Sequence, residues 1–139
     1  RAAAAAARAC VATLVRPNAR AERYARFLEA ATRAYEAFAF DEPPDLVVFH
    51  DGRLGADAEA YLRGALTKPP ATRFVAAAPR HGGANATARF WAVESWQLLA
   101  DLGYGAVLRL DGACLLLGAG APDPIARLRD GGLDALVGP

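Results

Sequence analysis

The sequence predicts a single α/β domain with a mostly parallel sheet flanked by helices. Short apolar runs rich in β-branched residues alternate four times with segments of helical spacing, which is typical of strand–helix–strand units joined by right-handed crossovers. One of these runs, Leu46–Phe49, is apolar at every position, as in a strand that is covered on both faces. The length of 139 residues suits one domain, and an apolar content of 54% is enough for a core.

We expect the strands where the apolar runs lie, because proline, glycine or charged residues bound each run. The four expected central strands are Val11–Val15, Leu46–Phe49, Phe74–Ala77 and Ala106–Leu110, and Leu115–Leu117 is a further short candidate.

Helices are expected between these strands. From Arg20 to Phe38, apolar side chains recur at spacings of three and four, with Arg and Glu on the other face and Asn18 as a possible cap. The Asp123-Pro124 pair has the form of a helix cap followed by a first-turn proline. The further helices are expected over Ala56–Leu66, over Ala86–Leu102 and from Pro124 to Asp130.

The chain divides into an alanine-rich, low-complexity tail over residues 1–9 and the α/β domain over residues 10–139. It begins at Arg1 without a methionine, and it ends at Gly138-Pro139 just after an element finishes. We therefore expect a truncated piece of a longer protein.

Composition argues against several classes of protein. Sixteen basic and fifteen acidic side chains nearly cancel, whereas domains that track nucleic acid phosphates are usually strongly basic. No apolar run approaches the length needed to span a bilayer. The two cysteines, Cys10 and Cys114, fall at opposite ends of their expected strands, which makes a disulfide between them improbable.

Charged side chains follow the expected strands, at the edge where ligands bind in open α/β sheets. Arginines and carboxylates at one edge suit a phosphate-bearing ligand with a divalent metal. The alternative is that these residues are ordinary solvated loop positions, since Asp-Gly pairs are common in turns. The residues concerned are Arg16, His50, Asp51, Arg80, His81, Arg109 and Asp111.

Other motifs give weaker indications. Gly118-x-Gly120 lacks the third glycine of a dinucleotide fingerprint. Trp91 and Trp96 fit a core or an interface better than a base-stacking platform. Asn85-Ala86-Thr87 matches an N-glycosylation acceptor, and Asn85 could equally cap a helix.

Several segments resemble glycosyltransferase family 15, the fungal-type α-1,2-mannosyltransferases. The Leu14-Val15-Arg16 end of the first strand resembles the Leu-Val-Arg-Asn that ends the first strand of that family. In the best-matching stretch, an Arg-Phe-aromatic start, a tyrosine and an Arg-x-Asp fall at the family spacing without a gap. The residues that carry this stretch are Arg89, Phe90, Trp91, Tyr104, Arg109 and Asp111, and Asp45–Asp51, Phe74–His81 and Asp123-Pro124-Ile125 are similar to further family segments.

The resemblance implies the donor-binding, N-terminal half of a GT-A-type catalytic domain. It implies GDP-mannose as the nucleotide-sugar donor, a glycan or glycoprotein acceptor, retention of configuration and Mn²⁺ as the metal. It further implies a Golgi-lumenal parent protein, anchored by a single membrane segment absent from this chain. Site roles carried over in this way are nucleotide contacts for Arg16, Asp51, Arg89 and Arg109, and metal ligation for Asp111.

The sequence departs from the family at the metal-site turn. Asp111-Gly112-Ala113 has one carboxylate where the family commonly has Glu-Pro-Gly and related enzymes often have Asp-x-Asp. The catalytic carboxylate of the family belongs to a second half outside this chain, so the catalytic residue stays unassigned. Two alternatives stay open: another α/β nucleotide-binding protein, such as a nucleotidyltransferase or a Rossmann-type module, and a non-catalytic truncated remnant.

Overall fold

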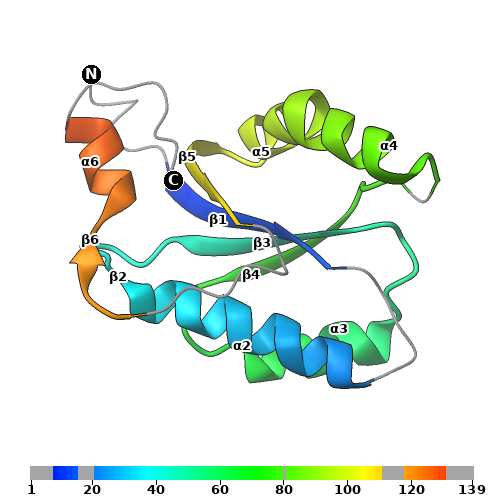
Figure 1. The fold of residues 1–139 in the computed structure, drawn as a ribbon, viewed down its shortest axis with the longest axis horizontal. Coiled ribbons are helices and arrows are strands. Elements are labelled where there is room, and N and C mark those ends of the chain that lie inside the picture. The colour runs from blue at the N-terminus through cyan, green and yellow to red at the C-terminus, as the bar shows by residue number, and fades with distance from the viewer. Residues whose placement is uncertain (1–7, 16–20, 80, 111–117, 131–139) are drawn as a thin grey trace.

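The computed structural model describes residues 8–15, 21–79, 81–110 and 118–130. Its centre is a parallel sheet in which the strands stand in the order β4-β3-β1-β5 (Figure 1). This confirms the predicted α/β class, the parallel sheet and the presence of all four expected strands, although only β3 and β1 are central and the other two lie at the edges of the described sheet. The strands are β1 (Arg8–Leu14), β3 (Asp45–His50), β4 (Thr72–Ala76) and β5 (Tyr104–Arg109).

Helices cover both faces of this sheet (Figure 1). Helices α2 (Ala21–Ala37) and α3 (Ala56–Ala65) lie on one face, whereas α4 (Gly83–Arg89) and α5 (Ser95–Asp101) lie on the other. The first two crossovers step outward from β1 to β3 and on to β4, and the third returns past β1 to β5. Because right-handed crossovers that run in opposite directions fall on opposite faces, this return places α4 and α5 opposite α2 and α3.

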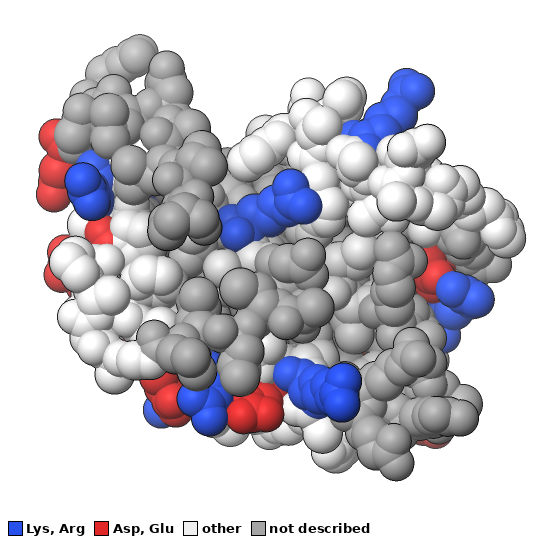
Figure 2. All heavy atoms as spheres, in the orientation of Figure 1, with Lys and Arg blue, Asp and Glu red and all other residues white. Residues whose placement is uncertain are grey.

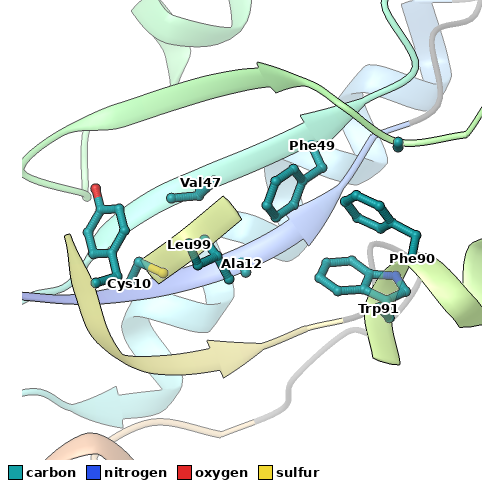
Figure 3. Packing of buried hydrophobic residues seen from close by; sticks show 9 residues of the cluster. Cys10, Ala12, Val47, Phe49, Phe90, Trp91 and Leu99 are labelled. Carbon is teal, nitrogen blue, oxygen red and sulfur yellow. The ribbon is translucent and has the colours of Figure 1, made fainter. Parts of the chain in front are cut away.

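Alternation along the inner strands divides the core between these two faces. Val11, Leu46 and Val48 pack toward Phe27 of α2 and Leu62 of α3. The core on the other face of the sheet is largely aromatic. There the ring of Phe49, from β3, packs edge to face with the rings of Phe90 and Trp91 (Figure 3). The ring centroids of Phe49 and Phe90 lie 5.0 Å apart, those of Phe49 and Trp91 5.8 Å, and those of Phe90 and Trp91 5.5 Å.

The third crossover differs from the uninterrupted helix expected over Ala86–Leu102. It begins at Gly83, so Asn85 lies inside the first turn of α4, and the interpretation of Asn85 as a helix cap is wrong. A π-helical turn, η1 (Phe90–Glu94), then separates α4 from α5. This wider turn brings the neighbours Phe90 and Trp91 both into the core, and the Ser95 hydroxyl donates a hydrogen bond to the Trp91 carbonyl at 2.9 Å.

A second, two-stranded sheet was not predicted. It pairs β2 (Phe38–Ala39) with β6 (Ala121–Pro122) in parallel, so Phe38 ends up in a strand and not in the preceding helix. Strand β1 begins at Arg8, two residues before the expected domain start at Cys10. The candidate strand Leu115–Leu117 and the candidate cap Asn18 lie outside the described residues.

Asp123 anchors the C-terminal part of the described chain. One carboxylate oxygen accepts hydrogen bonds from the backbone N–H groups of Ile125 (2.9 Å) and Ala126 (3.1 Å), which confirms the predicted cap of α6 (Pro124–Asp130). The other oxygen accepts from the Asp41 backbone N–H at 2.9 Å. One side chain therefore starts α6 and joins it to the loop that follows β2.

Replacing Asp123 with alanine should lower the free energy of unfolding by roughly 1–2 kcal/mol, since Asp123→Ala removes a helix cap and leaves the Asp41 N–H without this acceptor. Urea unfolding followed by circular dichroism measures the change. Asp130→Ala, an exposed change at the last residue of the same helix, is the matched control and should leave stability nearly unchanged. Equal stability of both variants would contradict the anchoring role.

Candidate functional site

The strand order reverses between β1 and β5. The chain leaves β1 in one direction to form β3 and β4, and it returns on the other side of β1 to form β5. In open α/β sheets, ligands bind at such a reversal, in the crevice outside the carboxyl ends of the strands. The described residues at these ends are joined across the sheet, because the Leu110 N–H donates to the Ala12 carbonyl and the Val15 N–H to the Phe49 carbonyl, both at 2.9 Å.

Arg109 is the predicted nucleotide contact that the structure describes at this reversal. It is the last residue of β5, and it lies opposite Ala12, two residues before β1 ends. Its side chain is exposed and extends over the face of Trp91, with the guanidinium carbon 4.5 Å from the centre of the indole. This stacking is a cation–π contact between the edge strand β5 and the π-helical turn.

Asp51 directly follows β3, and Arg53 engages its carboxylate. The Arg53 backbone N–H donates to one oxygen at 3.1 Å, and the Arg53 side-chain Nε–H donates to the other at 2.9 Å. The carboxylate is nearly buried, whereas 58% of the Arg53 side chain is exposed. The hydrogen bond to Asp51, together with its charge, raises the pKa of the Arg53 guanidinium, and the two side chains form an ion pair at the ligand edge.

Arg53 was not singled out from the sequence. The available signal was the spacing, because an Asp followed by Gly and then Arg can close a turn in which the carboxylate accepts both the backbone and the side-chain N–H of the arginine. His50, the last residue of β3, also contacts this turn, because its Nδ1 accepts a hydrogen bond from the Gly52 N–H at 3.1 Å.

The remaining predicted residues are dispersed or lie outside the described residues. Arg89 is exposed at the end of α4, two residues before Trp91, and His81 is exposed in the loop before α4. Asp51 and Arg109 belong to β3 and β5, whose axes are roughly 10 Å apart because β1 lies between them, and Arg109 is level with Val47, four residues before Asp51. Arg16, Arg80 and Asp111 lie outside the described residues.

Charge on the face of the molecule in Figure 2 is not gathered into one patch. The basic and acidic side chains that it shows are of both signs and are interspersed. Among the described residues, no group of three or more His, Cys, Asp or Glu side chains converges as a metal site. Within the same residues, no helix has the length and apolar character needed to cross a bilayer.

A second polar cluster lies at the opposite, amino edge of the sheet. The Tyr104 hydroxyl donates to the buried Asp45 carboxylate at 2.8 Å, and Arg8 pairs with the same oxygen at 3.4 Å. The Arg8 guanidinium also stands over the Tyr104 ring, 5.0 Å from its centre. Burial, and then the hydrogen bond to Asp45, raises the pKa of Tyr104 to about 12. These contacts join β1, β3 and β5 at the edge away from the expected ligand, which indicates a structural role.

Cys10 lies near this cluster and is a free, fully buried thiol. Burial, followed by the charge of Asp45, raises the pKa of Cys10 to about 12. A thiol held in its protonated form inside the core is a poor nucleophile. Cys10 therefore acts as a small apolar side chain in the aromatic half of the core.

No model of a known protein family, no curated protein and no solved structure matches this chain.

Because its pKa is raised, we expect Cys10 to react slowly with alkylating reagents in the folded protein. In a Cys114→Ser variant, which leaves Cys10 as the only thiol, iodoacetamide at about pH 8 should not modify the folded protein, because the reactive thiolate is scarcely populated and the side chain is buried. Modification should appear as urea unfolds the chain, as mass spectrometry can follow. Rapid modification of the folded variant would contradict this account of Cys10.

Proposed function

We propose that this chain is the donor-binding half of a glycosyltransferase with a GT-A-type fold. Its ligand is a nucleotide sugar, with GDP-mannose as the proposed donor, and the product is a mannosylated glycan or glycoprotein with retained configuration. Membrane attachment in the Golgi lumen would come from a segment of the parent protein outside this chain. The specific family and sugar rest on the sequence resemblance.

The observation that carries the proposal is the reversal of strand order between β1 and β5. Position 16 follows Val15 after β1, and positions 109–111 are the end of β5 and the residues after it. Three of the residues that the resemblance relates to donor binding, Arg16, Arg109 and Asp111, therefore end or follow the two strands that border the expected crevice, whereas Asp51 follows β3 and Arg89 ends α4.

The chemistry of sugar transfer suits cations at this edge. When the sugar leaves, negative charge develops on the diphosphate, and positive groups that are already in place stabilise it. In this proposal Arg16 and Arg109 bind the diphosphate, and Arg89 and Asp51 contact the nucleotide. Arg53 adds a guanidinium beside Asp51, so the β3 end of the edge offers both an acceptor and a donor.

Asp111 is the proposed ligand for Mn²⁺, since Mn²⁺ accepts oxygen ligands and the phosphates can supply several of them. The bound metal would neutralise charge on the leaving diphosphate. Asp51, the carboxylate that follows β3, is engaged by Arg53, and the metal role of Asp111 rests on the sequence resemblance.

A second candidate is a dinucleotide-binding module, because such proteins share this order of the first four strands. Their first strand is followed by a glycine-rich turn that approaches the pyrophosphate. Here Val15-Arg16-Pro17-Asn18 follows β1 and contains no glycine. Binding of GDP in preference to NAD favours the glycosyltransferase, and the opposite preference favours the module.

Arg16→Ala should weaken GDP binding by roughly 10- to 100-fold, the effect of losing a charge-assisted contact of about 1.5–3 kcal/mol. Isothermal titration calorimetry on the full-length protein measures it. Arg33→Ala is the matched control, since Arg33 is on α2 and pairs with Glu29. GDP affinity that is unchanged by Arg16→Ala removes Arg16 from the site.

Asp111→Asn should abolish the gain in GDP affinity that Mn²⁺ gives, because the amide loses the charge that the metal requires. The urea midpoint should stay nearly unchanged. Asp101→Asn is the matched control, at the end of α5 with a hydrogen bond to Gln97. If Asp111→Asn binds GDP with Mn²⁺ as tightly as the parent, the metal role of Asp111 is wrong.

A further inference from the structure

We propose that Trp91 is a positioning residue, whose indole face holds the Arg109 guanidinium ready to bind the diphosphate of a nucleotide. This inference rests on the proposed function. It assigns the substrate contact to Arg109 and gives Trp91 a role through Arg109, whereas the sequence alone favoured a core or interface role for Trp91.

The geometry of the pair carries the proposal. Arg109 ends the edge strand β5 beside the reversal of strand order, and the guanidinium carbon stands 4.5 Å from the indole centre. Trp91 is only 7% exposed, so its ring is fixed in the core. An exposed arginine thus lies on a rigid aromatic surface at the edge where ligands are expected.

Trp91 cannot easily turn away, because two aromatic rings pack against its indole and the conformation of its backbone is itself held. Its ring packs edge to face against Phe49 and Phe90, as Figure 3 shows. Its backbone carbonyl accepts the buried Ser95 hydroxyl. The π-helical turn that contains Trp91 directs it into the sheet together with Phe90.

Stacking leaves the recognition edge of an arginine available. A cation–π contact uses the flat face of the guanidinium, whereas phosphate oxygens bind in its plane, along the N–H bonds. Holding the side chain on Trp91 also reduces the rotamer freedom that Arg109 would otherwise lose when a ligand binds. The stacked arginine is therefore preorganised for an anion in the plane of the guanidinium.

The contrast with Arg53 supports this assignment. The Arg53 guanidinium donates to the Asp51 carboxylate, so its charge is already paired. Arg109 contacts an uncharged ring, and among the residues that the structure describes no carboxylate pairs with it. A diphosphate would supply the negative charge that the Trp91–Arg109 pair lacks.

The test uses a Trp96→Phe background, in which Trp91 is the only tryptophan. Trp96 is half exposed on α5, so this change should not disturb the core. GDP and guanosine are titrated while the emission of Trp91 and the heat of binding are measured. Binding of GDP should change the emission of Trp91. Arg109→Gln should weaken the affinity for GDP by roughly 10- to 100-fold and leave the affinity for guanosine unaffected. Arg33→Gln is the matched arginine control and should change neither.

Two changes at Trp91 separate positioning from mere folding. Trp91→Leu removes the aromatic face and should weaken the affinity for GDP by roughly 2- to 30-fold. Trp91→Phe keeps an aromatic face and should retain much of the affinity of the parent. In the Arg109→Gln background, Trp91→Leu should cause no further loss, because the two residues act through one contact. Both variants are made in the parent chain and measured by calorimetry.

The outcomes distinguish the two proposals. If the parent does not bind GDP, the proposed function is wrong. If the parent binds GDP but Arg109→Gln binds it equally well, the positioning role is overturned and the proposed function stands. The same conclusion follows if Trp91→Leu costs as much GDP affinity in the Arg109→Gln background as in the parent chain, a comparison in which a general effect of Trp91→Leu on folding cancels.

Discussion

Strand β3 is buried at all six of its residues, and much of the structure follows from the need to cover both of its faces. A parallel sheet cannot leave an apolar face in water, so helices must reach both sides. Two crossovers in one direction supply α2 and α3 to a single face. The other face can be covered only when the chain returns past β1, and that return creates the reversal of strand order between β1 and β5. The candidate ligand edge is thus a consequence of how the core is closed.

Much of this fold could be predicted from local sequence pattern. Leu46–Phe49 identifies an inner strand by its unbroken apolar run, and Asp123-Pro124 identifies the start of a helix by the chemistry of the cap. The strand order could not be read in this way, because it depends on which strands pair over long sequence distances. The short pairing of β2 with β6 was not predicted either, because strands of two residues show no periodic pattern of apolar side chains.

The candidate site was predictable in its location and less so in its contacts. Polar residues after strands indicated the edge, and Arg109 lies there. The partner of Asp51 was missed because Asp51, which follows a strand, was interpreted as facing a ligand. In the structure its carboxylate accepts a hydrogen bond from the side chain of Arg53, two positions later. The stacking of Arg109 on Trp91 depends on a π-helical turn, which brings Phe90 and Trp91 against Phe49 and leaves no pattern in the sequence.

The π-helical turn also determines which kinds of change this crossover can tolerate. Each residue of an ordinary helix advances the chain by about 100° around the axis. A π-helical turn takes up one residue more than an ordinary turn. In a regular helix, the eight residues from Trp91 to Leu99 would leave these two side chains about 80° apart, so the wide turn is what keeps both of them on the side that faces the sheet. Deleting one residue between Trp91 and Leu99 within this turn would leave them seven residues apart, close to two full turns of a regular helix, and would preserve that shared side. A further insertion would instead rotate the aromatic pair away from Leu99, so this crossover can be shortened at the wide turn more easily than it can be lengthened there.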